Sequence, residues 1–148
     1  MIIEINTQNA SPIYEQLRDQ IVLGIASKKL VEGEVLPSVR NLAADLGINF
    51  HTVNKAYTML CDEGYIVMDR RKGAVVAQIA AGNEEFLAKL SGRILLSSAE
   101  SVCHDMDENE FAALCRECYN NAKSGTKPEN LKNLENSKES IISGKEGI

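Results

Sequence analysis

A run of short polar side chains between residues 49 and 55 is the part of this sequence best suited to contact a ligand. Amide, imidazole, hydroxyl and ammonium groups occur there together, on Asn49, His51, Thr52, Asn54 and Lys55. An Asn amide can pair with adenine through two hydrogen bonds, Thr offers a hydroxyl and a methyl group, and Lys suits phosphate or guanine. This set of groups is typical of a helix that reads base edges in the DNA major groove.

Two short helices joined by a tight turn are predicted around this run. Ser38 can cap a first helix that Gly47 ends, and Asn49 can cap a second helix only two residues later. Gly64 ends the second helix in a left-handed turn. The second helix keeps its apolar residues at three- and four-residue spacing on one face, and these are Val53, Ala56, Tyr57 and Leu60. The pattern therefore predicts a helix-turn-helix whose second helix presents its polar first turns to DNA.

A β-hairpin is predicted directly after the second helix. Residues 65–68 and 74–77 are β-prone and flank the basic turn Arg70-Arg71-Lys72-Gly73. An ordinary amphipathic helix with a solvated polar face would explain neither the short turn nor the adjacent basic hairpin. The sequence therefore predicts a winged helix-turn-helix.

Three motifs follow one another through the first half of the chain. They are Ser11-Pro12-Ile13-Tyr14-x-Gln16-Leu17, Leu36-Pro37-Ser38-x-Arg40-x-Leu42-Ala43, and Thr52-Val53-x-Lys55-Ala56-Tyr57-x-x-Leu60-x-x-x-Gly64-Tyr65-Ile66. This ordered string resembles the DNA-binding domain of GntR-family bacterial transcription regulators. The small remainder of the chain is most similar to the YtrA-like branch of that family, in which a helical C-terminal part forms dimers.

The resemblance implies DNA contacts from the Arg of the Pro-Ser-x-Arg motif, the start of the second helix and the wing. The residues expected to contact double-stranded DNA are Ser38, Arg40, Asn49, His51, Thr52, Asn54, Lys55, Arg71, Lys72 and Gly73. The sequence departs from the branch at Phe50 and His51, where Pro and Asn are common, and at residues 72–74, where a Gly-x-Gly-Thr wing is usual. These departures do not change the predicted fold. They lie in segments expected to contact DNA, so they affect which operator sequence the protein would recognise.

The segment before the helix-turn-helix is expected to support it. Residues 1–6 are β-prone and predict a short strand. Ser11 as the cap and Pro12 as the first helical residue predict a helix start. The apolar stripe of that helix consists of Ile13, Leu17, Ile21 and Ile25.

Two more helices are predicted after residue 77. Asn83 can cap one of them, and Asp107 with Glu110 resembles a capping box that starts the other. Two helices cannot enclose a core alone, so their apolar stripe is expected to meet a second copy of the chain. The residues expected at this homodimer interface are Leu90, Ile94, Phe111, Leu114, Cys115, Cys118 and Tyr119.

The fold class expected from these elements is α+β, mainly α. Residues 1–78 are expected to form the winged helix-turn-helix domain and residues 79–123 the helical dimerisation region. Residues 124–148 are rich in Lys, Glu, Asn and Ser, which favours a polar tail that is frayed or disordered.

Composition limits the class of protein further. The net charge of the 148-residue chain is −5, but residues 1–78 hold eight basic and nine acidic side chains, so the acidity concentrates in the other half. The chain starts with no basic segment followed by an apolar run, which predicts a cytoplasmic protein with reduced thiols and no membrane partner. It has neither a phosphate-binding Gly loop nor a nucleophile with an evident His partner, so we expect no enzyme and no cofactor.

We therefore expect a sequence-specific transcription regulator that acts as a repressor and binds a palindromic operator as a homodimer. One alternative is a winged-helix module that binds a protein, in keeping with the acidic total. Another is a metal or redox sensor built on Cys103, Cys115 and Cys118. In a helical hairpin Cys103 would lie roughly 10 Å from Cys115 along the helix axis, too far for a shared tetrahedral site, so no metal is expected. The sequence identifies no small-molecule effector.

Overall fold

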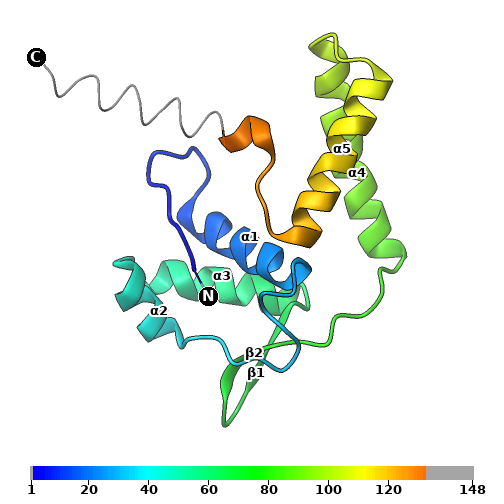
Figure 1. Cartoon of the computed structure of the whole chain (residues 1–148). Coiled ribbons are helices and arrows are strands. Elements are labelled where there is room, and N and C mark those ends of the chain that lie inside the picture. Colours follow the sequence, from blue (N-terminus) through cyan, green and yellow to red (C-terminus); the bar gives the residue numbers. More distant parts are fainter. Residues whose placement is uncertain (1, 133–148) are drawn as a thin grey trace, which may run out of the picture. The chain divides into compact units, whose positions relative to one another are not determined.

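The computed structural model describes residues 2–132, and the chain divides into two compact units between Ala81 and Gly82. The fold is mainly helical with one small antiparallel sheet, as predicted (Figure 1). The elements are α1 (Ile13–Ala26), α2 (Val39–Leu46), α3 (Phe50–Asp62), β1 (Ile66–Asp69), β2 (Gly73–Val76), α4 (Glu84–Cys103) and α5 (Glu108–Ser124). Within the described residues, no helix is both long and apolar enough to cross a membrane.

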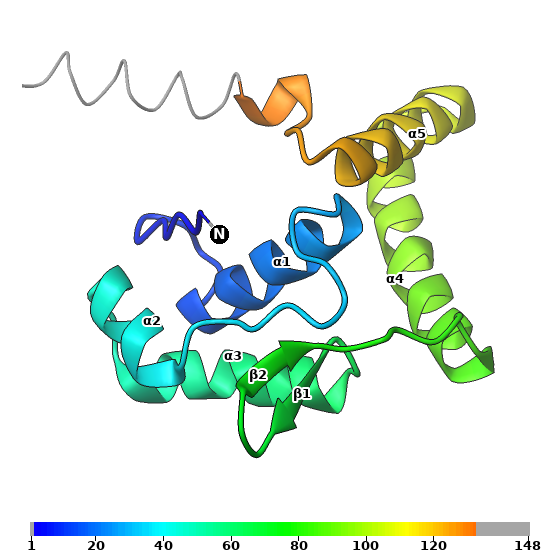
Figure 2. The ribbon, with the colours of Figure 1, turned by 60° about the horizontal axis from the view of Figure 1, so that its bottom comes forward.

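Helix α3 is the centre of the first unit, where it packs against α1, α2 and β1 (Figure 2). Its apolar face is buried as predicted, and Leu17 and Ile21 of α1 are fully buried against the same core. The Arg18 guanidinium of α1 forms an ion pair with Glu63, which directly follows α3. The first unit therefore has one continuous core that fixes α3 in place.

The predicted ends of α2 and α3 are confirmed. The Ser38 hydroxyl accepts a hydrogen bond from the Asn41 amide at 3.1 Å, and Gly47 ends α2 with a φ of 64°. The Asn49 side chain then caps α3 by accepting from the His51 amide at 2.7 Å. At each of these helix ends a capping residue at the end itself pairs backbone groups that the helix leaves free, so no longer connecting segment is needed to pair them.

The end of α3 directs the chain into the hairpin. Gly64 has a φ of 82°, and the Tyr65 amide donates to the Leu60 carbonyl at 2.9 Å. The Gly64 amide donates to the Cys61 carbonyl at 3.1 Å. These two bonds form the Schellman motif expected for a glycine at this position.

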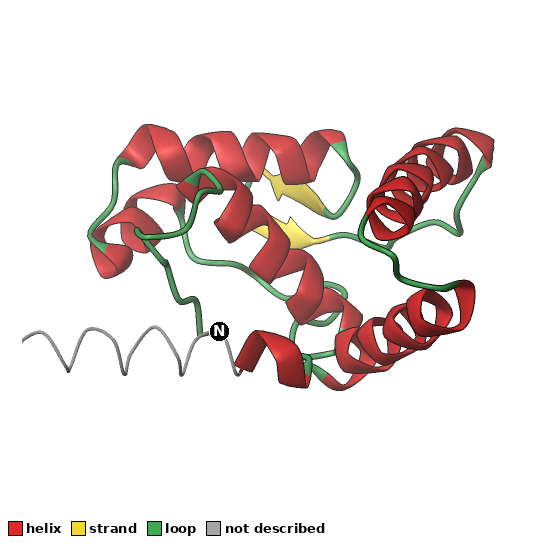
Figure 3. Ribbon diagram, turned by 90° about the horizontal axis from the view of Figure 1, so that it is seen from above, coloured by secondary structure: helices red, strands yellow, loops and turns green. Residues whose placement is uncertain are grey.

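The hairpin pairs β1 with β2 in antiparallel register, from Ile66 opposite Val76 to Asp69 opposite Gly73 (Figure 3). Both strands are shifted by one residue from their predicted bounds, and Gly73 is a strand residue rather than part of the turn. The connector before α2 runs beside β2, because the Leu36 amide donates to the Ala74 carbonyl at 2.8 Å. The hairpin is thus attached on its β2 side to the rest of the unit.

The predicted N-terminal strand is wrong. Residues 2–6 form no strand, and their amides pair with two glutamine side chains of α1 rather than with another strand. The Gln20 Oε1 accepts from the Glu4 amide at 2.9 Å, and the Gln16 Oε1 accepts from the Asn6 amide at 3.0 Å. The predicted cap is also wrong by one residue, since α1 begins at Ile13 with Pro12 in the cap position.

The second unit consists of α4 and α5. The Asn83 side chain caps α4 by accepting from the Phe86 amide at 2.9 Å, and Asp107 and Glu110 form the predicted capping box of α5. The turn between the helices contains Asp105 with a φ of 57°. Neither helix contains a buried side chain. By itself, this unit therefore has no core.

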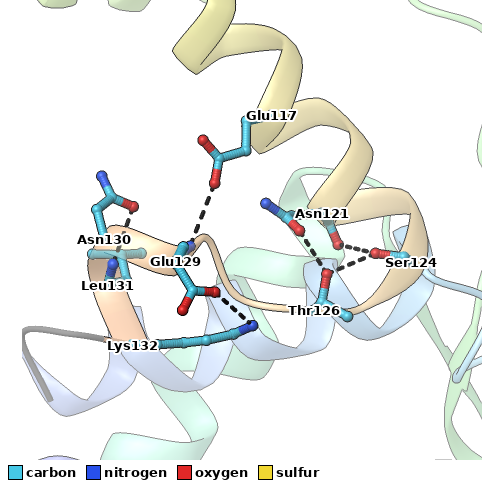
Figure 4. A network of polar contacts seen from close by, with 8 residues as sticks. All are labelled: Glu117, Asn121, Ser124, Thr126, Glu129, Asn130, Leu131 and Lys132. Atoms are coloured by element: carbon cyan, nitrogen blue, oxygen red, sulfur yellow. Dashed lines mark hydrogen bonds and ion pairs between the residues drawn. The ribbon is translucent and has the colours of Figure 1, made fainter. Parts of the chain in front are cut away.

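The chain turns back after α5, as Figure 4 shows. The Thr126 hydroxyl donates to the Asn121 side chain at 2.6 Å, and the Glu129 amide donates to Glu117 at 3.4 Å. These contacts hold the start of the predicted polar tail against the last turns of α5. The rest of that tail, residues 133–148, lies outside the described residues.

Candidate nucleic-acid interface

The first two turns of α3 form an exposed polar surface. His51, Asn54 and Lys55 are exposed and lie three and four residues apart, so they share one side of the helix, while Thr52 is half-buried. The opposite side is buried in the core. Core packing therefore fixes the axis of α3, and these polar groups are left facing solvent.

Asn49 has a structural role as well as its predicted place at the start of this surface. Its Oδ1 accepts from the His51 amide, so this oxygen is already engaged. A two-bond contact with adenine needs both the oxygen and the nitrogen of the amide. Asn49 can therefore offer a base its Nδ2 group, whereas the exposed Asn54 is better placed for a two-bond contact.

Lys55 is positioned by a contact that the sequence analysis missed. Its Nζ lies 3.8 Å from the ring centroid of Tyr14, at the start of α1. Such a contact restrains the long side chain and leaves its charge in place. No local pattern shows it, because the two residues are 41 positions apart in the sequence.

Tyr57 joins α3 to the segment that leads into α2. Its hydroxyl donates to the Pro37 carbonyl at 2.7 Å. The sequence pattern predicted only that Tyr57 belongs to the apolar face of the helix, and not this hydrogen bond. Pro37 directly precedes the Ser38 cap, and Arg40 is exposed in the first turn of α2. The Tyr57 bond therefore helps to set the distance between the start of α2 and the polar surface of α3.

Burial raises the pKa of Tyr57 to about 12, from an ordinary value of 10.0. The folded protein thus keeps this proton at a pH where the unfolded chain loses it. Tyr57 therefore contributes its full stabilisation below about pH 10. This contribution declines as the pH rises towards about 12.

We expect Tyr57→Phe to lower the free energy of unfolding by about 1 kcal/mol near neutral pH, because the bond to Pro37 is lost. The difference in stability between the wild type and this variant should shrink between pH 10 and about 12, since only the wild type loses the tyrosine contribution. Urea unfolding of both proteins across this range measures the difference. A gap that stays constant with pH would contradict a buried hydroxyl that keeps its proton.

The turn of the hairpin is organised by Asp69, which the sequence analysis did not single out. Its Oδ1 accepts from the backbone amides of Arg71 at 2.8 Å and Lys72 at 2.9 Å. These hydrogen bonds, the Lys72 one first, hold the pKa of Asp69 below its ordinary value. Gly73 then takes a φ of 85°, which suits glycine. As a result, the side chains of Arg70, Arg71 and Lys72 are exposed on a turn whose backbone is held in place.

A second candidate surface lies between α4 and α5. A groove of about 430 Å³ is lined mostly by apolar and small side chains together with one cation, Arg93. The other lining residues are Leu90, Ile94, Ser97, Phe111, Leu114, Cys115 and Cys118. The structure thus brings together all the residues predicted for the dimer interface except Tyr119, which is 68% exposed. Within residues 2–132, no three His, Cys, Asp or Glu side chains are grouped so that they could hold a metal ion.

Two helices across a short turn, an exposed polar start of the second helix and a basic hairpin define a winged helix-turn-helix protein of the DNA-binding class. The family described as bacterial regulatory proteins, gntR family, matches residues 10–76. The chain belongs to this family and is a GntR-family DNA-binding transcription regulator.

Relatives by sequence include two proteins of Bacillus subtilis. The HTH-type transcriptional regulator YhcF is 33% identical over 88 residues, which cover 60% of this chain and 73% of the relative. The HTH-type transcriptional repressor YtrA is 37% identical over 79 residues, which cover 53% of this chain and 61% of the relative.

Two solved structures extend the similarity beyond the DNA-binding unit. A transcriptional antiterminator from Listeria monocytogenes matches with a TM-score of 0.79 at 27% identity, over 87% of this chain and 98% of that one. YtrA from Sulfolobus acidocaldarius, a GntR-family transcription factor, matches with a TM-score of 0.56 at 39% identity, over 68% of this chain and 99% of that one. The resemblance to the GntR family and its YtrA-like members is therefore confirmed.

Proposed function

We propose that this protein is a cytoplasmic, homodimeric repressor that binds a palindromic operator. The observation that carries the proposal is the exposed polar start of α3, fixed by a buried opposite face and accompanied by a basic turn with a braced backbone. The relative YtrA of Bacillus subtilis is named as a transcriptional repressor, which supports repression rather than activation.

The proposed DNA contacts divide into two kinds. Base edges are read by the start of α3, where Asn54 suits adenine and His51 and Thr52 offer further hydrogen bonds. Phosphates are held by cations and by small groups near helix or strand ends. This second set consists of Ser38, Arg40, Lys55, Arg71, Lys72 and Gly73, whereas Asn49 offers its Nδ2 group to a base. The wing should therefore contribute affinity more than specificity.

The homodimer is proposed from the second unit. Helices α4 and α5 bury no side chain, and the predicted interface residues that line their groove are exposed or half-buried, with Ile94 48% exposed. A second copy that covers this groove would supply the core that one copy does not have. We therefore assign dimerisation to residues 79–123 and DNA binding to residues 1–78.

Selection of duplexes from a random DNA pool by the full chain tests this function. We expect the enriched sequences to be two-fold symmetric, with half-sites about one helical turn apart, because a symmetric dimer presents two equal reading helices. Binding to them should weaken steeply with added salt, since each phosphate contact releases counterions. A pool that shows no enrichment, with binding that does not respond to salt, would favour a module that binds a protein.

A further inference from the structure

Phe50 is an aromatic side chain at the edge of the polar surface of α3. It is the first residue of that helix and is 43% exposed. It does not belong to the core cluster or to the partly buried residues packed against it. Packing in the core of the first unit therefore does not account for this ring.

The ring of Phe50 contacts the neighbouring side chain. It packs edge-to-face against His51, with ring centroids 5.7 Å apart and ring planes at 85°. On an α-helix, residue 50 neighbours residues 53 and 54, and here Val53 is buried while Asn54 is exposed. Phe50 thus lies at the border between the core face and the polar face, directly beside groups that suit bases.

The chemistry of the major groove indicates what such a ring can contact. Among the four bases only thymine presents an apolar group there, its 5-methyl, and phenylalanine is one of the side chains that contacts it. An A·T pair also presents the adenine N6 and N7 atoms that suit an Asn amide. Phe50 and Asn54, four residues apart, would therefore favour half-sites that contain A·T pairs.

We propose that Phe50 is a specificity-determining residue that contacts a thymine 5-methyl group in each operator half-site. This inference rests on the proposed function, in which the start of α3 enters the major groove. His51 serves as a positioning residue for the Phe50 ring in addition to its own contacts. The ring thus gives the reading surface an apolar component that its polar groups cannot supply.

The test replaces thymine by uracil, which removes only the methyl group. The probes are the duplex most enriched from the random pool and copies of it with single symmetric T-to-U changes in both half-sites. One buried methyl corresponds to about a fourfold change in affinity, so one such pair of changes should weaken wild-type binding about 16-fold. Phe50→Ala should bind more weakly overall and lose this discrimination at that position alone.

Two further variants distinguish the loss of the thymine methyl contact from a general loss of DNA affinity. Phe50→Leu keeps an apolar group and should retain part of the T-to-U effect. Arg71→Ala in the wing should weaken all duplexes and leave the T-to-U ratio unchanged. Enriched half-sites without thymine, or a T-to-U effect that persists in Phe50→Ala, would overturn this inference and leave the proposed function intact. A pool with no enriched sequence would overturn both.

Discussion

Replacing Leu114 by aspartate is expected to give a soluble monomer whose DNA-binding unit remains folded. Leu114 lines the groove between α4 and α5, so the new carboxylate would lie in the apolar surface that we assign to the second copy. A carboxylate loses its hydration in such an interface and opposes association; among the residues that line the groove, only Arg93 carries a charge that could pair with it. The first unit has its own core and contains none of the groove residues, so its fold should not depend on Leu114.

The loss of the dimer should weaken binding to a full palindrome about 100- to 10,000-fold, towards the affinity for one half-site. The reason is that a second DNA-binding unit is no longer held near the second half-site at high effective concentration. Light scattering measures the assembly state, and titration of full-site and half-site duplexes measures the loss. Leu114→Met is the matched control, since it keeps an apolar side chain of similar volume and should remain dimeric. A wild-type protein that is monomeric at micromolar concentration would contradict the proposed interface.

The helix ends around the reading surface could be predicted because their determinants are local. Ser38 and Asn49 satisfy amides two or three residues away, and Gly47 and Gly64 supply the left-handed conformation at their own positions. Each of these effects depends on residue type and short spacing, which a sequence displays directly. This is why the helix-turn-helix was predicted with its ends in place.

Contacts between distant residues could not be predicted in the same way. Residues 2–6 have the composition of a strand, but Gln16 and Gln20 of α1 take the place of a neighbouring strand. The bond from Tyr57 to Pro37 likewise spans 20 residues. Composition indicates that a segment is suited to a strand, but it does not identify the group that pairs with it.

The candidate site likewise has features that the sequence predicted and features that only the structure shows. All the residues expected to contact DNA are exposed or half-buried, as their polar character suggests. The structure confirms the predicted Asn49 cap, which engages the side-chain oxygen of Asn49, and it adds that Asp69 holds the backbone of the wing turn. Asp69 carried one sequence signal, since Asp before a turn often accepts from amides two residues on.

Lys55 gives the second large effect that we expect on DNA binding. Replacing it by methionine keeps the aliphatic length of the side chain and removes the charge. A charged hydrogen bond contributes about 1.5–3 kcal/mol, so affinity for the operator should fall about tenfold or more. The slope of log affinity against log salt should fall by about 0.9 if Lys55 holds one phosphate. Lys55→Glu should be weaker still, because its carboxylate would repel that phosphate.

The contact between Lys55 and Tyr14 makes this prediction more specific. Tyr14→Phe keeps the aromatic face below the Nζ group and should bind operator like the wild type, whereas Tyr14→Leu removes the face. A cation–aromatic contact of about 0.5–1 kcal/mol predicts a two- to fivefold loss for Tyr14→Leu. In the Lys55→Met background the same change should have no further effect, because the cation that the ring holds is gone. Independent losses that add in the double variant, or a salt slope that Lys55→Met leaves unchanged, would show that Tyr14 does not position Lys55 on a phosphate.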